Sequence, residues 1–392
     1  MPAELLAPLD SRTLRQREFA ALGARVFLNA AGYGPLPQRS LDAAAHYQQR
    51  RARAELGEAD FLPALVPARA AAARLIGAHP DEIALCPNTN VGINIAASIV
   101  RQRRRQGDPR NVIIVSEGEF PANVYPWLAL ERDGFSVRFI PTDALGRPRE
   151  AELLAALEAP DVCALALSAV QFATGWRADL GAFGERCQAR DILFVVDAIQ
   201  AAGVVPLDVR TQHVDVLAAG GQKWLLAPYG TGFTFVRAGL CRLFEPELPG
   251  WLAFRASSDF NRLCTYEYEL YEDARRFEVG TIPYHDVVAF RASLELILEV
   301  GVGVIWQHVR DLQQPLLEWV QARDDASLVS PHDHHGSGIV CLRTRDVQAT
   351  FAALTIGNVV CVLREGSIRI APHLYNTPSD IEHVIGILEH TA

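Results

Sequence analysis

The chain has 392 residues and a formal net charge of −9. This length exceeds one ordinary hydrophobic core, so we expect a large domain with a smaller one beside it. The acidic balance argues against a nucleic-acid partner. No stretch approaches the roughly 18 apolar residues of a membrane helix, and the first residues lack the pattern of a signal peptide, so the sequence predicts a cytoplasmic protein that makes no membrane contact.

Apolar runs that read as strands alternate with helical segments over most of the chain. These runs lie near 83–86, 112–116, 136–140, 163–168, 193–197, 215–219 and 233–237. The alternation predicts an α/β fold with a mostly parallel seven-stranded sheet. Beyond residue 282 long helices are interleaved with short strands near 339–343, 359–363 and 367–370, which predicts a smaller α+β C-terminal domain. We therefore divide the chain into an N-terminal segment 1–30 that packs on the small domain, a large domain 31–281 and a small domain 282–392.

Two charged residues follow neighbouring strands of this predicted sheet. The buried-looking run "ILFVVD" ends on Asp197, and Lys223 follows the next apolar strand after Gly220 and Gly221. Open α/β sheets bind ligands at the carboxyl ends of their strands, so both side chains are expected at one crevice. A lysine that forms an imine and a carboxylate that keeps a ring nitrogen protonated are the two groups that pyridoxal phosphate requires. Taken singly, Asp197 could instead cap the next helix and Lys223 could be a solvated loop cation.

A second feature points to a phosphate group. In "IALCPNTNVGINIAASIV" a short strand leads through a polar turn into an amphipathic helix, so Asn88, Thr89 and Asn90 lie at a helix N-terminus. Free backbone N–H groups there form a ready anion site. Ordinary capping of the helix by Asn88 or Thr89 is the alternative.

Eight blocks in a fixed order carry a resemblance over nearly the whole chain. They are "LNAAGYGPLP", "NTNVGINIAA", "EGEFPANVYPW", "LSAVQFATGWRADL", "VVDAIQAAG", "GGQKW", "FEVGT" and "SIRIAPHLYNT". The sequence resembles the class V aminotransferases, a fold type I group of pyridoxal-phosphate enzymes that includes cysteine desulfurases, kynureninases and isopenicillin N epimerase-like proteins. The resemblance implies the fold type I architecture and pyridoxal 5'-phosphate as cofactor.

The resemblance also assigns cofactor-binding roles. Thr89 and Asn90 match phosphate-binding positions, Phe120 would stack on the cofactor ring, and the Gln200 amide would reach its phenolic oxygen. Gln222 stands where desulfurases carry a histidine, and Gly220 where they carry a phosphate-binding serine. These two departures weaken the desulfurase interpretation, because an amide can donate to phosphate but cannot shuttle a proton.

Substrate binding and assembly follow from the remaining blocks. Arg369 matches the arginine that takes the substrate carboxylate, and Asn29 in "LNAAGYGPLP" is a second candidate substrate-binding residue. Gly280 and Thr281 match residues that reach the phosphate of the other subunit, which implies a homodimer with composite sites. The partners expected are therefore a small-molecule amino acid and a second copy of the chain.

The function expected from these residues is catalysis at the α-carbon of a small amino acid. Lys223 would hold the cofactor covalently and, once released, move a proton as general base and acid, while Asp197 keeps the ring nitrogen protonated. We expect an aminotransferase. The open alternatives are a carbon–sulfur (β-elimination) lyase similar to cysteine desulfurases, an epimerase, and a non-catalytic sensor or scaffold that binds the cofactor.

Three other motifs are interpreted as structural. The basic run 101–106 closes the helix that begins at the phosphate turn, where cations suit the helix dipole. His332, Asp333, His334 and His335 lie in a Gly- and Ser-flanked loop without a further ligand at a fixed offset, so no metal site is predicted. Seven scattered cysteines without Cys-x-x-Cys spacing are typical of reduced thiols. Cys361 lies only eight residues before Arg369, which leaves no room for the mobile loop that carries a desulfurase's sulfur acceptor, so we expect a buried thiol.

Overall fold

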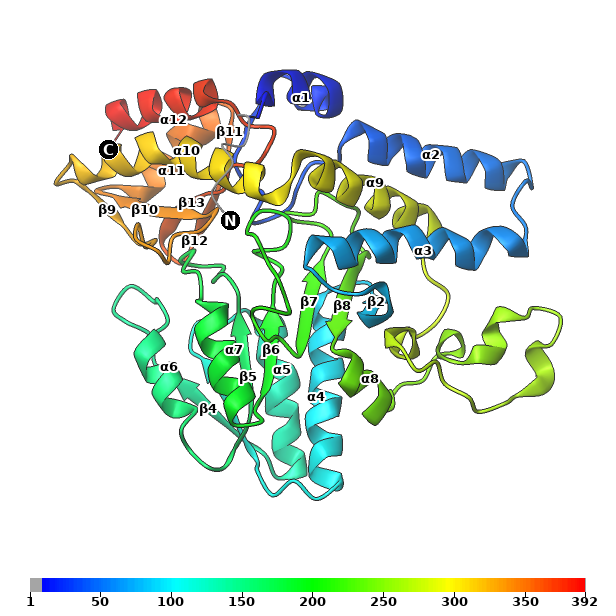
Figure 1. Ribbon diagram of the computed structural model, residues 1–392. Coiled ribbons are helices and arrows are strands. Elements are labelled where there is room, and N and C mark those ends of the chain that lie inside the picture. The colour runs from blue at the N-terminus through cyan, green and yellow to red at the C-terminus, as the bar shows by residue number, and fades with distance from the viewer. Residues whose placement is uncertain (1–8, 392) are drawn as a thin grey trace.

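The computed structural model describes residues 9–391, and its central element is a seven-stranded sheet in the order β2-β8-β7-β6-β5-β3-β4 (Figure 1). All pairs are parallel except those of β8, which runs antiparallel to both β2 and β7. The predicted mostly parallel sheet is confirmed. Its strands are β2 (Ile83–Leu85), β3 (Val112–Ser116), β4 (Ser136–Ile140), β5 (Val162–Ser168), β6 (Leu193–Asp197), β7 (Val216–Gly220) and β8 (Gly232–Val236).

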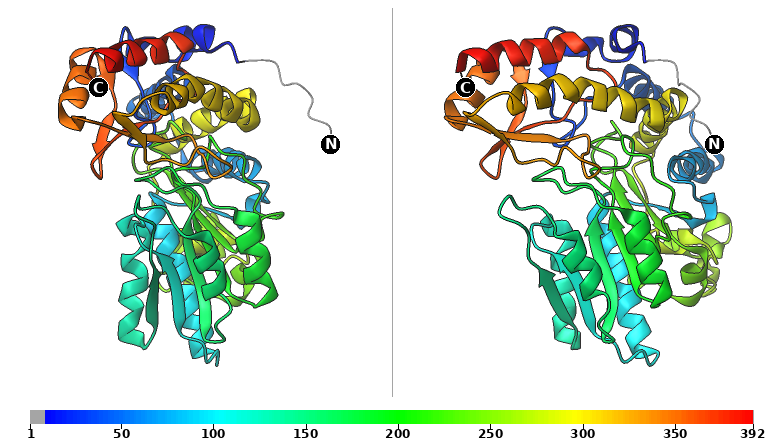
Figure 2. Two further views of the ribbon diagram at one scale, coloured as in Figure 1. Left: turned by 90° about the vertical axis from the view of Figure 1, so that its left-hand side faces the viewer. Right: turned by 60° about the vertical axis from the view of Figure 1, so that its left-hand side comes forward.

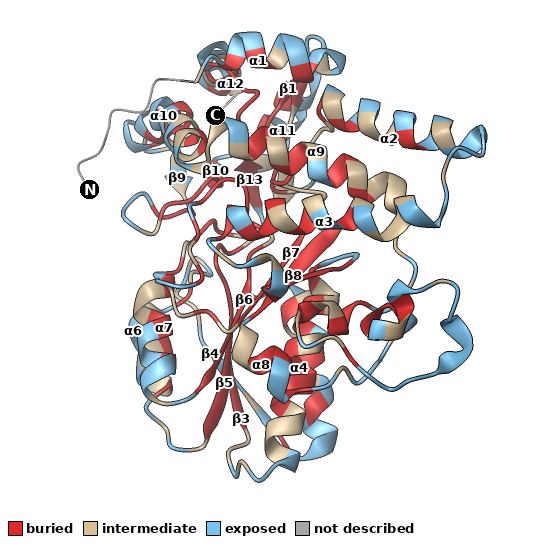
Figure 3. Cartoon of the chain, turned by 45° about the vertical axis from the view of Figure 1, so that its right-hand side comes forward, coloured by how far each residue is buried: buried red, intermediate tan, exposed pale blue. Residues whose placement is uncertain are grey.

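Helices cover both faces of this sheet, because alternate residues of its buried strands point to opposite sides. One face packs against α4 (Thr89–Arg105), α5 (Tyr125–Leu128) and α8 (Ala238–Leu243). The other packs against α3 (Glu58–Leu75), α6 (Glu150–Ala156), α7 (Leu180–Ala189) and α9 (Tyr284–Val300). Figure 3 shows the strands as the buried layer between helices whose outer faces are exposed. This three-layer arrangement leaves the carboxyl ends of the parallel strands as the place where polar side chains can gather.

A smaller unit lies over those strand ends (Figure 2). Its antiparallel sheet has the order β12-β13-β10-β9, and the strands are β9 (Ala326–Leu328), β10 (Val340–Thr344), β12 (Val362–Arg364) and β13 (Ser367–Ile370). The sheet packs against α10 (Val302–Gln321), α11 (Val347–Ile356) and α12 (Pro378–Thr391). The sequence patterns predicted β10 and β13 and missed β9. The single strand expected near 359–363 is divided in the structure, because residues 359–360 form β11 in a separate sheet with β1 and only β12 joins this one.

The N-terminal segment joins this smaller unit. Strand β1 (Val26–Phe27) pairs in parallel with β11 (Val359–Val360), and Arg15 of α1 (Ser11–Glu18) forms a 3.0 Å ion pair with Asp380 of α12. Residues 1–8 of the predicted segment 1–30 lie outside the described residues. Helix α9, which begins just after the predicted boundary at 282, packs on α2 (Gln38–Ala52) and α3 of the preceding part of the chain. In the part of the chain from 9 to 391, none of the helices is long and apolar enough to cross a bilayer.

Candidate active site

Lys223 and Asp197 meet at the ends of adjacent parallel strands. Asp197 is the last residue of β6 and pairs in register with Ala218 of β7, and Lys223 follows the end of β7 by three residues. The Asp197 side chain is buried, and one of its oxygens accepts a 2.9 Å hydrogen bond from the Ile199 N–H. The strand order therefore places an amine and a carboxylate at one crevice.

Burial shifts the pKa values of both Asp197 and Lys223. It raises the pKa of Asp197 to about 6, although the Ile199 N–H and the charge of Lys223 act in the opposite direction. It also lowers the pKa of Lys223 to about 8; Asp197 opposes this shift, and the cations Arg369 and Arg364 add to it. Such opposed shifts bring the proton affinities of a lysine and an aspartate toward neutral pH, where both can exchange protons.

Two glycines shape the loop that presents Lys223. A Cβ at Gly221 would lie 2.4 Å from Thr231 Oγ1, and a Cβ at Gly34 would lie 2.4 Å from the Lys223 carbonyl oxygen. The Gly34 N–H donates a 2.8 Å hydrogen bond to the Gln222 carbonyl, which fixes the segment 29–34 against this loop. The loop is thus held between β8 and the N-terminal segment, and Lys223 cannot shift without moving both.

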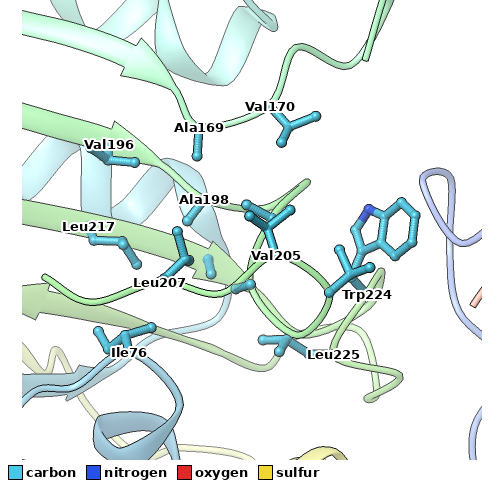
Figure 4. Packing of buried hydrophobic residues seen from close by; sticks show 14 of the residues in the cluster. Ile76, Ala169, Val170, Val196, Ala198, Val205, Leu207, Leu217, Trp224 and Leu225 are labelled. Atoms are coloured by element: carbon cyan, nitrogen blue, oxygen red, sulfur yellow. The ribbon is translucent and has the colours of Figure 1, made fainter. Parts of the chain in front are cut away.

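Trp224 anchors the same loop through hydrogen bonds to Gln200 and His373. Its indole Nε1 donates a 2.7 Å hydrogen bond to Gln200 Oε1, and its carbonyl bonds to His373 Nε2 at 2.9 Å. Figure 4 shows the indole within the apolar cluster that includes Val205 and Leu225. The Gln200 amide nitrogen also donates to the Ala31 carbonyl, so one of its two N–H groups stays available for a ligand.

The N-terminus of α4 lies beside this loop. Asn88 caps the helix by accepting from the Val91 N–H, and Thr89 Oγ1 accepts a 3.0 Å hydrogen bond from the Gly220 N–H. The helix approaches the sheet closely because Gly92 has no side chain: a Cβ there would lie 2.5 Å from Ala218 Cβ. The helix N-terminus, with its free N–H groups, therefore lies at the strand end that precedes Lys223.

Phe120 covers the Lys223 amine. Lys223 Nζ lies 5.5 Å from the centroid of the Phe120 ring, and that ring makes an edge contact with Phe172 at 5.3 Å. Phe120 is 42% exposed although its ring lies beside the half-buried Lys223. Asn90 holds the Phe120 loop through a 3.1 Å hydrogen bond from its Nδ2 to the Ala122 carbonyl.

Arg369 and Asn29 approach from the smaller unit and the N-terminal segment. Arg369 is buried on β13, and its Nη1 donates a 2.8 Å hydrogen bond to the Phe172 carbonyl. Asn29 forms an isolated bridge with Ala371, two residues beyond Arg369. The Arg369 side chain and the Asn29 backbone are thereby held in place, and Arg369 shares the segment around Phe172 with the Phe120 ring.

Thr281 lies apart from this group within one chain. It is exposed and lines a cavity of about 560 Å³ together with Trp251 and Tyr284. Within the described part of the chain, the walls of this cavity include none of the other predicted site residues. Thr281 is thus the one predicted site residue that lines this cavity among residues 9–391.

Two residues near the crevice were not singled out from the sequence. Glu119 is buried beside Phe120 and accepts hydrogen bonds from Ser168, Gln171 and Asn123, and burial raises its pKa to about 7, with the charge of Asp197 also raising it. Arg364 lies on β12, next to the strand of Arg369. In the sequence, Glu119 is only an acidic residue after a strand and Arg364 only an arginine on a short strand. Both patterns are common on protein surfaces, so neither singled out a site residue.

The unsatisfied polar atoms test whether these residues fit pyridoxal phosphate and an amino acid. Within residues 9–391, four buried side-chain atoms in this region have no hydrogen-bond partner: Asn29 Oδ1, Gln222 Oε1, Arg364 Nε and Arg369 Nε. Buried polar atoms are normally paired, so their concentration here indicates a polar ligand. A Cβ at Gly220 would lie 2.6 Å from Gln222 Oε1, so a larger residue at position 220 would displace the Gln222 amide. The two arginine N–H groups can donate to an anionic group, and the two amide oxygens can accept from an N–H or O–H group. Together with the open ring face of Phe120 and the lysine, they fit the cofactor and an amino acid.

Comparisons with known proteins agree with this geometry. A sequence profile described as "Aminotransferase class-V" matches residues 26–384. An uncharacterized aminotransferase, YcbU, of Bacillus subtilis (strain 168) is 30% identical over 80% of each chain. An isopenicillin N epimerase of Amycolatopsis lactamdurans is 27% identical over 92% of this chain and 94% of its own.

Solved structures share the fold at lower identity. A cysteine desulfurase from Thermococcus onnurineus NA1 superposes with a TM-score of 0.82 at 20% identity, and the match covers 97% of both chains. The cystine C-S lyase C-DES, solved with cysteine persulfide, gives a TM-score of 0.84 at 21% identity over 96% of this chain and 100% of its own. The profile match across the chain decides the assignment. The chain belongs to the class V aminotransferase family of fold type I enzymes that use pyridoxal 5'-phosphate.

Proposed function

We propose that this protein catalyses transamination of a small amino acid. One observation carries the proposal: the half-buried Lys223 and the buried Asp197 lie at adjacent strand ends, close enough to buried Arg369 for its charge to act on the lysine, and Arg369 Nε has no partner within residues 9–391. Bound pyridoxal phosphate supplies a sink for the electrons released when a bond at the substrate α-carbon breaks. The protein's own side chains would transfer the protons and bind the substrate.

Lys223 and Asp197 are the proposed catalytic residues. Lys223 Nζ would hold the cofactor covalently and then carry a proton to and from the substrate α-carbon, a task that suits an amine with a pKa of about 8. Asp197 would hold a proton at the cofactor's ring nitrogen. Because Asp197 is buried, its charge acts there with little screening by solvent.

The other site residues bind and orient. Phe120 would stack on the cofactor ring, Gln200 would donate to its phenolic oxygen, and Thr89, Asn90 and Gln222 would hold its phosphate at the N-terminus of α4. Arg369 offers its Nε and remaining N–H groups to the substrate carboxylate in a planar fork. Asn29 Oδ1, a buried acceptor that has no partner within residues 9–391, would accept a hydrogen bond from the amino group of the substrate.

A homodimer would complete the site through Thr281. The segment that precedes Thr281 exposes large apolar side chains, as expected of a surface that a second copy covers. Those residues are Leu243, Leu248, Trp251, Leu263, Tyr266, Tyr268 and Val279.

The cysteines favour transamination over sulfur transfer. A desulfurase needs a reactive thiol to accept sulfur, but burial raises the pKa of Cys361 to about 12 and of Cys341 to about 11. Cys341 also donates to the Ala173 carbonyl at 3.1 Å. Cys264 is the one cysteine among residues 9–391 that is exposed, and it lies in the 3-10 helix Leu263–Thr265, in the exposed apolar segment described above.

The test is a panel of amino acids offered to the cofactor-loaded protein with and without 2-oxo acids. We expect a new amino acid to form from the 2-oxo acid, measured by chromatography, and no product without it. Ammonia, pyruvate or sulfide released without a 2-oxo acid would replace the proposal with a lyase, and racemised substrate would replace it with an epimerase. An unchanged cofactor spectrum across the panel would contradict catalysis and leave a binding protein.

A further inference from the structure

Arg364 and Arg369 lie on the same face of the small sheet. In the antiparallel pairing of β12 with β13, Val362 lies opposite Arg369, and Arg364 is two residues further along β12. Residues two apart on a strand point to the same side, so the two arginines are diagonal neighbours, and such residues lie roughly 7–8 Å apart with their Cβ atoms somewhat closer. Cys341, opposite Arg369 on β10, belongs to this face as well.

This face of the sheet points toward the crevice of the large domain. Arg369 donates to the Phe172 carbonyl at 2.8 Å, and Cys341 donates to the Ala173 carbonyl, so both contact the segment that also holds the Phe120 ring. Arg364 and Arg369 both lower the pKa of Lys223, as two cations do when they face the same space as the amine. Arg364 thus lies within the electrostatic reach of the reacting centre.

Arg364 forms no ion pair with any carboxylate of residues 9–391. Its Nε is buried and, within residues 9–391, finds no hydrogen-bond partner. Arg343, a third arginine of the same sheet, differs: its Nε donates to Ser367 Oγ at 3.1 Å and its Nη2 to the Glu365 carbonyl at 3.5 Å. A guanidinium with a buried, unpaired N–H is costly unless a ligand supplies the missing acceptor.

One amino-acid carboxylate leaves the second guanidinium unsatisfied. The planar fork of Arg369 matches a single carboxylate, which occupies its open N–H groups. We propose that Arg364 determines specificity by binding a second carboxylate, carried on the side chain of the substrate, so that the site selects an acidic amino acid over its neutral amide. This inference rests on the proposed function, because it names the substrate class of that same site.

The experiment compares matched substrates in the cofactor-loaded protein. Glutamate against glutamine, and aspartate against asparagine, differ by little more than the side-chain charge, so the ratio of their kcat/KM values isolates the second carboxylate. Loss of a hydrogen bond to a charged group amounts to about ten- to hundredfold in this ratio. We expect Arg364→Gln to reduce the preference by that factor while the cofactor content stays as in the wild type. The ratio cancels any change in the pKa of Lys223, because both substrates of a pair react with the same amine.

A binding measurement separates recognition from chemistry. Glutarate and its half-amide carry no amino group and cannot react, so titration calorimetry reports their dissociation constants alone. Arg364→Gln should weaken glutarate by about tenfold or more and leave the half-amide unchanged. Arg343→Gln is the matched control on the same sheet and should alter neither.

The outcomes distinguish the two proposals. The role of Arg364 would be overturned if the wild type had equal kcat/KM values for acidic and neutral substrates. It would also be overturned if Arg364→Gln lowered the kcat/KM values of both by the same factor. Either result would leave the proposed transamination standing. No reaction with any amino acid would remove the proposed function and this inference with it.

Discussion

Thr89 Oγ1 accepts a 3.0 Å hydrogen bond from the Gly220 N–H, and this bond joins the first residue of α4 to the last residue of β7. The helix N-terminus proposed to hold phosphate is thereby tied to the strand that presents Lys223. The Thr89 hydroxyl keeps its own hydrogen for a further acceptor, because it acts here only as the acceptor. One side chain can therefore set the distance between the phosphate and the lysine.

Replacing Thr89 by valine keeps the shape of the side chain and removes the acceptor. The buried Gly220 N–H would lose its partner, so we expect the free energy of unfolding to fall by about 1–3 kcal/mol and the affinity for pyridoxal phosphate to fall as well. Denaturant unfolding and cofactor titration measure the two effects. Thr89→Ser retains the hydroxyl and should recover both; a valine variant with unchanged cofactor affinity would exclude Thr89 from the phosphate site.

Much of this site could be predicted because its signals are local. Continuous apolar runs marked the strands of the large sheet, and the strand order alone placed Asp197 and Lys223 at one edge. Strand β9 was missed because its three residues, Ala326–Leu328, are only partly buried or exposed and form too short a run for a strand pattern to be recognised. Its existence depends on pairing with β10, which a local pattern does not report.

The residues that were missed depend on contacts between distant segments. Glu119 is buried and Glu117 is exposed, although both follow the same strand two residues apart. Arg364 and Arg343 are likewise both arginines on short strands. Only the structure shows that Arg343 Nε is hydrogen-bonded and that Arg364 Nε finds no partner in the described part of the chain. Burial and pairing of a charged side chain are decided by tertiary packing, which explains why propensity and periodicity could not separate these pairs.

Lys223 is the single lysine of the chain. Reduction of the cofactor-loaded protein with borohydride should therefore attach the cofactor irreversibly to one tryptic or chymotryptic peptide, identified by mass spectrometry as the peptide that contains residue 223. Lys223→Met should abolish this product and lower turnover by at least a thousandfold, as loss of an essential acid–base group does. A cofactor adduct on the variant, or turnover near the wild-type rate, would exclude Lys223 from both roles.

The ionisation of Lys223 can be measured directly for the same reason. In the cofactor-free protein an amine-reactive reagent can modify only Lys223 and the N-terminal amine, which peptide mapping separates. Burial lowers the pKa of Lys223 to about 8, so the fraction of neutral amine, and with it the rate of modification, should rise through pH 8 and level off above it. An ordinary lysine would still gain reactivity near pH 10.

Asp197 provides the variant for this measurement. Its negative charge raises the pKa of Lys223, so Asp197→Asn should move the midpoint of the modification profile to lower pH. Asp179→Asn, a change at a helix N-cap residue of α7, is the control and should leave the midpoint in place. A profile that Asp197→Asn does not shift would show that the two charges do not interact.

Glu119 carries the last prediction. Its carboxylate accepts hydrogen bonds from the Ser168 N–H at 2.7 Å, from Gln171 Nε2 at 2.8 Å and from Asn123 Nδ2 at 3.1 Å. Ser168 in turn pairs in register with Asp197, so this cluster braces the strand end that carries the proposed catalytic carboxylate. Glu119→Gln would present an N–H group to at least one of these donors, and we expect the free energy of unfolding to fall by about 1–3 kcal/mol.

The pH dependence of this loss gives the sharper test. Burial raises the pKa of Glu119 to about 7 from a value of 4.5, so between these pH values the folded state binds more protons than the unfolded state. The contribution of Glu119 to stability is then fully present below pH 4.5 and is lost as the pH rises through 7. Glu119→Gln should therefore cost more stability at pH 5 than at pH 8, as measured by denaturant unfolding. Glu117→Gln alters the exposed neighbour and should cost the same at both values; a loss for Glu119→Gln that does not change with pH would show that the carboxyl keeps its ordinary pKa in the folded protein.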